Sequence, residues 1–255
     1  MKYQFLRLEI QPPVATITLD RAPENLLHID MMEEVNHALL AVRRKSGVAV
    51  LVLRGAHGLF SKGIDYQELA RDRVQRLLQV YSRIFESIRM MRVISIAAVE
   101  GHAFGGGFEL ALGCNLIVAA DNATFALPEI RSGLIPPIAC IVLPRIAPRR
   151  RAMEWILTGN EIGVEQLYHD GIVTRLFPAG AFDEGLASFL EELSSKSAPV
   201  LQLAKRAQTE AYYSTYEEAL YKVQNIFLRE LAELADAREG VRAYLAGRAA
   251  SWRNR

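Results

Sequence analysis

Two nearly unbroken apolar runs, residues 48–53 (VAVLVL) and 93–99 (VISIAAV), constrain the fold of this chain more than any other feature. Such runs are typical of β-strands that are covered on both faces, as in a parallel sheet. The segment from about residue 67 to 91 has helical periodicity, and a loop rich in small residues follows each run. This alternation of strand, loop and helix predicts an α/β fold.

The remaining segments first continue this alternation of strand and helix and then become entirely helical. Strands are expected at residues 5–10, 14–19, 116–119, 124–126 and 172–177, and helices at 30–45, 108–113, 149–158, 164–169, 182–193, 199–213 and 215–245. The chain has no Gly/Ser-rich linker, but from about residue 199 every segment favours helix. We therefore expect a core over residues 1–198 and a continuous helical C-terminal region over 199–255.

Composition narrows the class of protein. The 255 residues are 51% hydrophobic and 23% charged, which is typical of a globular protein, and the formal net charge is +1. This balance gives no electrostatic reason to expect nucleic acid or a membrane as a partner. Cys114 and Cys140 lie in apolar context, the first residues do not resemble a signal peptide, and no apolar run approaches about 20 residues. A cytoplasmic protein is the expectation.

The loop after the first apolar run contains Gly63, Ile64 and Asp65. Ligands of α/β proteins usually bind at loops that follow parallel strands. Gly63 permits a backbone turn that would direct the N–H of Ile64 outward. The alternative is a connecting loop with a turn glycine.

Three consecutive glycines, Gly105, Gly106 and Gly107, follow the second apolar run and precede a short helix with Glu109 in its first turn. They would let a ligand approach unpaired N–H groups at a helix N-terminus. The spacing matches no phosphate-binding fingerprint, and Glu109 would repel a phosphate. A transient oxyanion fits this loop better than a permanent anion.

Glu129 stands between a proline and an isoleucine. A carboxyl group in apolar surroundings loses solvation, which raises its pKa, unless it is paired. The alternative is a salt bridge to Arg131 or Arg145. No metal site is expected, since His102 has no other ligand at a suitable spacing.

Together these stretches resemble the crotonase (enoyl-CoA hydratase/isomerase) superfamily over nearly the whole chain. The matching segments are residues 23–27 (PENLL), 60–65 (FSKGID), 101–110 (GHAFGGGFEL) and 128–130 (PEI) with 133–134 (GL). Within the superfamily, residues 128–144, 239–245 and 252–255 are most similar to the cyclohexa-1,5-diene-1-carbonyl-CoA hydratases.

The resemblance implies a ββα spiral core, a helical C-terminal trimerisation region, and a homotrimer or dimer of trimers. It implies a hydratase that acts on an unsaturated acyl-CoA, in which CoA is part of the substrate and no other cofactor is needed. The N–H groups at Ile64 and Gly106 would bind the thioester oxygen. Glu109 would deprotonate water, and Glu129 would exchange a proton with a substrate carbon. Further substrate-binding positions would be Lys62, Gly63, Asp65, Gly105 and Pro137.

The chain departs from the family pattern at Lys62, at Leu127 and at residues 136–139 (PPIA), which replace a glycine-rich turn. Lys62 would contact a CoA phosphate or simply face solvent. The altered turn should reshape the acyl pocket, which argues against a straight-chain substrate. An enoyl-CoA isomerase and a non-catalytic RNA-binding or CoA-binding member of the fold remain the alternatives.

Overall fold

A six-stranded sheet forms the centre of the molecule in the computed structural model, which describes residues 3–254. Its strand order is β1 (Leu6–Gln11), β2 (Val14–Leu19), β3 (Val50–Gly55), β4 (Ile94–Val99), β6 (Leu116–Ala120) and β9 (Arg175–Phe177). Only β1 and β2 pair in antiparallel fashion; the other neighbours are parallel. The parallel centre confirms the α/β class expected from the apolar runs.

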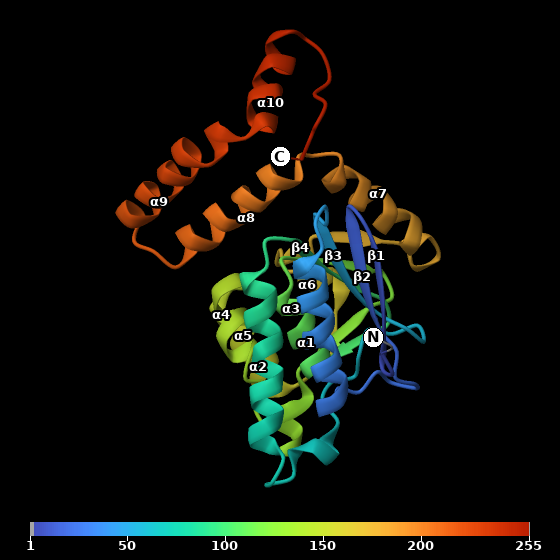
Figure 1. The fold of residues 1–255 in the computed structure, drawn as a ribbon. Coiled ribbons are helices and arrows are strands. Elements are labelled where there is room, and N and C mark those ends of the chain that lie inside the picture. The colour runs from blue at the N-terminus through green and yellow to red at the C-terminus, as the bar shows by residue number, and fades with distance from the viewer. Residues whose placement is uncertain (1–2, 255) are drawn as a thin grey trace.

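Both faces of this sheet are covered, as Figure 1 shows. Leu51 and Leu53 of β3 belong to a core shared with α1 (Ile29–Arg44), α2 (Val74–Met90) and α3 (Gly106–Gly113). Val50 and Val52 pack in a second core with Phe182, Leu186 and Phe189 of α7 (Phe182–Ser194). Successive strand residues point to opposite faces, so a strand in this position requires an apolar residue at every position.

A small second sheet lies beside the first and carries part of the candidate site. It contains β5 (His102–Phe104), β7 (Thr124–Ala126) and β8 (Ile162–Gly163). Helices α4 (Ala139–Ile146) and α5 (Arg149–Thr158) lie between β7 and β8 in the sequence, and α6 (Val164–His169) follows β8. Strands β5 and β8 were not predicted, since segments of two or three residues have too little periodicity to be recognised, and helix α4 was not predicted either.

Two predicted elements are shorter than expected. The helix expected from residue 67 begins instead as the 3-10 helix η1 (Tyr66–Leu69), and α2 starts only at Val74. The strand expected over 172–177 is confined to β9, because the N–H groups of Ile172 and Val173 donate to the carbonyl of Leu167 in the turn after α6. Among residues 3–254, no helix is both long and apolar enough to cross a membrane.

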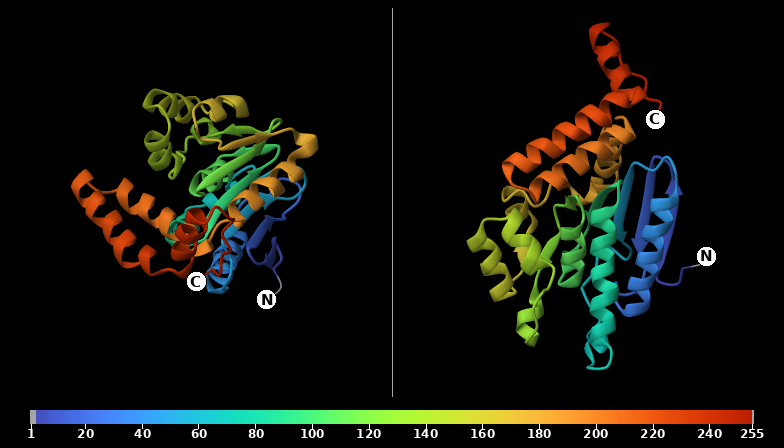
Figure 2. Two further views of the ribbon diagram at one scale, coloured as in Figure 1. Left: turned by 90° about the horizontal axis from the view of Figure 1, so that it is seen from above. Right: turned by 60° about the vertical axis from the view of Figure 1, so that its left-hand side comes forward.

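The C-terminal helices α8 (Ala198–Tyr212), α9 (Tyr216–Arg229) and α10 (Ala235–Leu245) project from the core (Figure 2). The single helix expected over 215–245 was wrong, since the chain turns through η4 (Leu231–Glu233) and an extended Leu234. This turn places the buried carboxylate of Asp236 2.7 Å from the hydroxyl of Ser197, which precedes α8. The backbone N–H groups of Arg253 and Asn254 also donate to Asp236, so one carboxylate fixes the last turn of the chain.

Candidate active site

The loops at the carboxyl ends of β3 and β4 meet at one place. The loop after β3 pairs with β5 through a parallel bridge between Ser61 and Ala103. The carbonyl of Ser61 accepts a hydrogen bond of 2.9 Å from the N–H of Phe104. The first glycine-containing loop is thereby held against the segment that leads into the three glycines.

This pairing brings the N–H groups of Ile64 and Gly106 together. A Cβ atom built on Gly106 would lie 3.4 Å from the nitrogen of Ile64, and one built on Gly63 would lie 3.2 Å from the nitrogen of Gly106. Gly63 has a φ of 102° and Gly105 a φ of 49°, so both turns need glycine. Within residues 3–254 neither N–H group donates to a protein acceptor. Two backbone donors are therefore free to bind one ligand oxygen.

The carboxylate of Glu109 is fully buried and accepts three hydrogen bonds. The N–H groups of Ile138 and Ala139, at the start of α4, donate to Oε1 over 2.6 and 2.7 Å. The hydroxyl of Tyr81 donates to Oε2 over 2.7 Å. Burial raises the pKa of Glu109 to about 7, although the three hydrogen bonds oppose this shift. This carboxyl group can exchange a proton near neutral pH.

Glu129 lies in η2 (Pro128–Ser132), and its carboxyl group packs against Gly105. A Cβ atom on Gly105 would lie only 2.4 Å from Oε1 of Glu129. Oε2 is buried and has no hydrogen-bond partner among the described residues. Burial raises the pKa of Glu129, and the charge of Glu129 in turn raises the pKa of Glu109. The two carboxyl groups thus belong to one site.

Within residues 3–254, Glu129 forms no salt bridge to Arg131 or Arg145, which was the alternative interpretation of this residue. A guanidinium nitrogen of Arg131 donates to Oδ1 of Asn160 over 2.7 Å, and Arg145 donates to the carbonyl of Ile141. Among the described residues, the half-buried carboxyl group of Glu129 therefore has no compensating cation.

Three other predicted positions lie at the edge of the site. Nζ of Lys62 is 2.8 Å from Oε1 of Glu24, so a CoA phosphate would have to compete with this carboxylate. Asp65 pairs with Arg21 at 2.9 Å and also caps η1. Pro137 is half-buried and directly precedes Ile138, whose N–H binds Glu109.

Sequence reasoning did not assign a role to Asn25, which organises the loop that carries Ile64. Its side-chain amide donates to the carbonyls of Ala56, Leu59 and Phe60, and its Oδ1 accepts from the N–H of Arg21. The side chain is fully buried, and φ is 50°, a left-handed conformation that asparagine tolerates better than most residues. The presence of Asn25 in the family-like segment PENLL was the sequence feature that could have pointed to this role.

Replacing Asn25 with alanine is expected to lower the free energy of unfolding by about 2–4 kcal/mol, because buried carbonyl acceptors lose their donor and φ becomes strained. Urea unfolding followed by circular dichroism measures this loss. The same change at the half-buried Asn225 near the surface, whose amide donates to Tyr221 of its own helix, is the matched control. Equal stability of the two variants would contradict the role given to Asn25.

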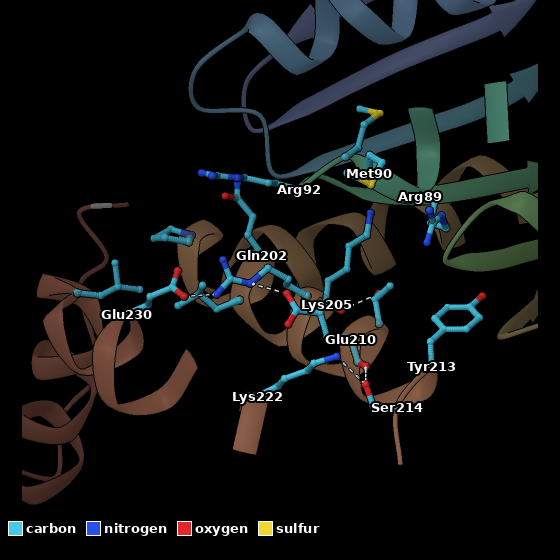
Figure 3. A pocket seen from close by; sticks show the side chains of 16 residues that line it. Arg89, Met90, Arg92, Gln202, Lys205, Glu210, Tyr213, Ser214, Lys222 and Glu230 are labelled. Atoms are coloured by element: carbon cyan, nitrogen blue, oxygen red, sulfur yellow. Dashed lines mark hydrogen bonds and ion pairs between the residues drawn. The ribbon is translucent and has the colours of Figure 1, made fainter. Parts of the chain in front are cut away.

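A separate cavity of about 570 Å³ lies between the end of α2 and helices α8 and α9 (Figure 3). Among the side chains that line it, Arg206 contacts Glu210 and Glu230, and Lys222 donates to the hydroxyl of Ser214. Lys205 donates to the carbonyl of Val93 over 2.8 Å, and burial lowers its pKa to about 8. No predicted site residue lines this cavity, which adjoins the amino end of β4 and not the carboxyl end.

Comparison with known proteins agrees with this geometry. A sequence profile of the Enoyl-CoA hydratase/isomerase family matches residues 9–255, and the chain belongs to this family. It is 33% identical to a probable enoyl-CoA hydratase of Rhizobium meliloti over 100% of both chains, and 29% identical to 2,3-dehydroadipyl-CoA hydratase of Escherichia coli over 96% of this chain and 97% of that protein. The crystal structure of an enoyl-CoA hydratase from Bacillus anthracis superposes with a TM-score of 0.93 at 26% identity, covering 99% of this chain and 100% of the other. The expected crotonase fold is thereby confirmed.

Proposed function

We propose that the protein is a hydratase that adds water to an unsaturated acyl-CoA thioester, and that its substrate is a cyclic dienoyl-CoA such as cyclohexa-1,5-diene-1-carbonyl-CoA. The observation that carries the hydratase assignment is the pair of unlike carboxyl groups beside two free N–H donors. Glu109 has three donors that favour its anion, whereas Oε2 of Glu129 has none among the described residues. One group is suited to accept a proton and the other to give one.

In the proposed reaction the thioester oxygen binds between the N–H groups of Ile64 and Gly106. Glu109 removes a proton from water, and the resulting hydroxide adds to the electrophilic end of the conjugated system. Negative charge moves to the thioester oxygen, where fixed donors stabilise it without reorganisation. Glu129 then donates a proton to a carbon of the enolate. The substrate gains one water molecule, and return of a proton from Glu109 to Glu129 through solvent restores both carboxyl groups.

The proposed cyclic substrate rests on the resemblance and on the segment 136–139. This segment, PPIA, stands where enoyl hydratases commonly have a glycine-rich turn, and its two prolines restrict the backbone where glycine would not. The next two N–H groups are committed to Glu109, which keeps this segment close to the base. A rigid wall beside the base favours a compact ring over a long flexible chain.

The experiment that tests the proposal is a panel of CoA thioesters incubated in water enriched in oxygen-18. Straight-chain enoyl, cyclic monoenoyl and cyclic dienoyl thioesters are compared by product mass. We expect labelled alcohol from the cyclic diene at the highest kcat/KM. A shifted double bond without label would identify an isomerase. Labelled product chiefly from the straight chain would contradict the cyclic substrate, and salt-dependent RNA binding without turnover would favour the binding protein.

The proposal also predicts the pH dependence of the reaction. Glu109 must be ionised to accept a proton from water, and burial raises its pKa to about 7. We therefore expect kcat/KM to fall about tenfold per pH unit below pH 7, and to fall again at high pH, where Glu129 loses the proton that it must donate. Initial rates between pH 5 and 9 in buffers of constant ionic strength measure this limb. A profile that is flat from pH 5 to 8 would rule out Glu109 as the base.

The trimer, or dimer of trimers, remains part of the proposal. The C-terminal helices expose large apolar side chains, which supports contact with other copies of the chain. The most exposed of these are Tyr213, Tyr216, Tyr221, Phe227, Leu228, Val241, Tyr244 and Leu245.

A further inference from the structure

We infer that Tyr81 is a positioning residue whose hydroxyl fixes the direction from which Oε2 of Glu109 accepts the proton from water. This inference rests on the proposed function, since it concerns the same base. Neither the glycine loops nor the carboxyl pair pointed to Tyr81, which lies in the middle of α2, far from these segments in sequence.

The position of Tyr81 is fixed by packing. The side chain is fully buried, and its ring lies edge-on to Phe85, with centroids 4.8 Å apart and an interplanar angle of 82°. The hydroxyl oxygen is 2.7 Å from Oε2 of Glu109 and 3.2 Å from the carbonyl oxygen of Gly106. Helix α2 thus reaches both the base and the residue that supplies one of the two free N–H groups.

The hydrogen bonds leave only one acceptor position on the carboxylate. An ionised carboxylate offers about four lone-pair sites, two on each oxygen. The N–H groups of Ile138 and Ala139 occupy both sites on Oε1, and Tyr81 occupies one on Oε2. The remaining site is on Oε2, so water must transfer its proton there. Without the Tyr81 hydroxyl, Oε2 would offer two directions and water would be held less specifically.

The second contact of the hydroxyl accommodates the change in charge. When Glu109 is ionised, Tyr81 donates its single proton to Oε2. When Oε2 has received a proton, the hydroxyl can rotate, donate to the carbonyl of Gly106, and accept from the protonated Glu109. Rotation of a hydroxyl needs no movement of the buried ring, so both states of the base keep a hydrogen-bond partner.

Hydrogen-bond donors have to stabilise the anion here, because the neighbouring titratable groups do not. Those that face Glu109 are Tyr81 from α2, Glu129 from η2 and Cys140 from α4. None of them is a cation, and the charge of Glu129 raises the pKa of Glu109. Burial also raises the pKa of Tyr81 well above its ordinary value, so the hydroxyl remains a donor across the working range of pH.

The decisive experiment is Tyr81→Phe, which removes the hydroxyl and keeps the ring. Loss of a donor to the anion raises the pKa of Glu109, and we expect a shift of about one pH unit. The acidic limb of kcat/KM should move from about 7 to about 8. The rate would then fall about tenfold at pH 6 but less than twofold at pH 9. Tyr3→Phe, which removes a hydroxyl that contacts only His37 near the surface, is the matched control.

A second readout separates this inference from the proposed function. The Glu109 carboxyl is titrated by carbon-13 NMR in protein labelled at glutamate Cδ, with Glu109→Gln used to assign the signal. An upward shift in Tyr81→Phe supports the inference even if no thioester is turned over, in which case the proposed function fails alone. An unmoved Glu109 titration overturns the inference, as does a loss of rate that is equal at pH 6 and pH 9.

If Tyr81→Phe does not fold, 3-fluorotyrosine at position 81 replaces it, since ring and hydroxyl are both retained. The fluorine makes the hydroxyl a stronger donor. We then expect the pKa of Glu109 to fall, opposite in sign to the effect of phenylalanine. An unchanged or raised pKa in the fluorinated protein would overturn the inference.

Discussion

Replacing Glu109 with glutamine is expected to lower kcat by about 10³-fold, within the range that general acid–base catalysis supplies. Glutamine keeps the size of the side chain and can still accept hydrogen bonds from the N–H groups of Ile138 and Ala139 through its oxygen. Its NH₂ group would face Tyr81, whose hydroxyl can turn to the carbonyl of Gly106. The fold should therefore survive while the group that accepts the proton is lost.

The measurement is steady-state turnover of the best thioester from the panel, together with product affinity by calorimetry. We expect the affinity for the CoA product to stay within about threefold of the original, because the carboxylate has no role in holding CoA in this proposal. Glu154→Gln, which removes an exposed carboxylate paired with Arg151 on α5, is the control. Turnover by Glu109→Gln at the level of Glu154→Gln would remove Glu109 from the mechanism.

Gly106→Ala is expected to lower kcat by about 10²–10³-fold through loss of the oxyanion site. The new methyl group would lie 2.9 Å from Cγ1 of Ile64 and 3.4 Å from its backbone nitrogen, in the space where both N–H groups would meet a thioester oxygen. Overpacking of this kind also costs about 1–3 kcal/mol of stability. Turnover and the midpoint of thermal unfolding are therefore measured on the same sample.

The control for this variant is Gly180→Ala, since a Cβ atom at Gly180 meets nothing within 4 Å. It adds the same methyl group to the same residue type without approaching the site. A Gly106→Ala protein that stays folded at the assay temperature and retains at least a third of the original kcat would show that Gly106 does not bind the developing oxyanion.

The parallel centre of the sheet could be predicted because its signal is local. The residues of β3 alternate between two separate cores, so the sequence must be apolar at nearly every position. The break between α9 and α10 could not be predicted in this way. It depends on contacts of Asp236 with Ser197 and with the last residues of the chain, which no periodicity within residues 215–245 contains.

The residues of the candidate site also divide into those that local sequence predicts and those that depend on distant contacts. Gly63 and Gly105 were recognisable because positive φ angles and close backbone approaches leave glycine as the suitable residue. Tyr81 was not, because a tyrosine on the buried face of a helix has the pattern of any core aromatic. Its partner Glu109 comes from another helix, 28 positions away. Only the packing of α2 against α3 reveals that the two side chains meet.

The two N–H groups that hold Glu109 come from residues 136–139, the stretch that we propose shapes the acyl pocket. In this proposal, a substitution at Pro136 or Pro137 that admits a different acyl group is expected to shift the amides of Ile138 and Ala139 as well, and with them the pKa of Glu109. Acyl selectivity and rate would then change together. We therefore expect that variants which accept new thioesters will differ from the original protein in optimal pH as well as in preferred acyl group.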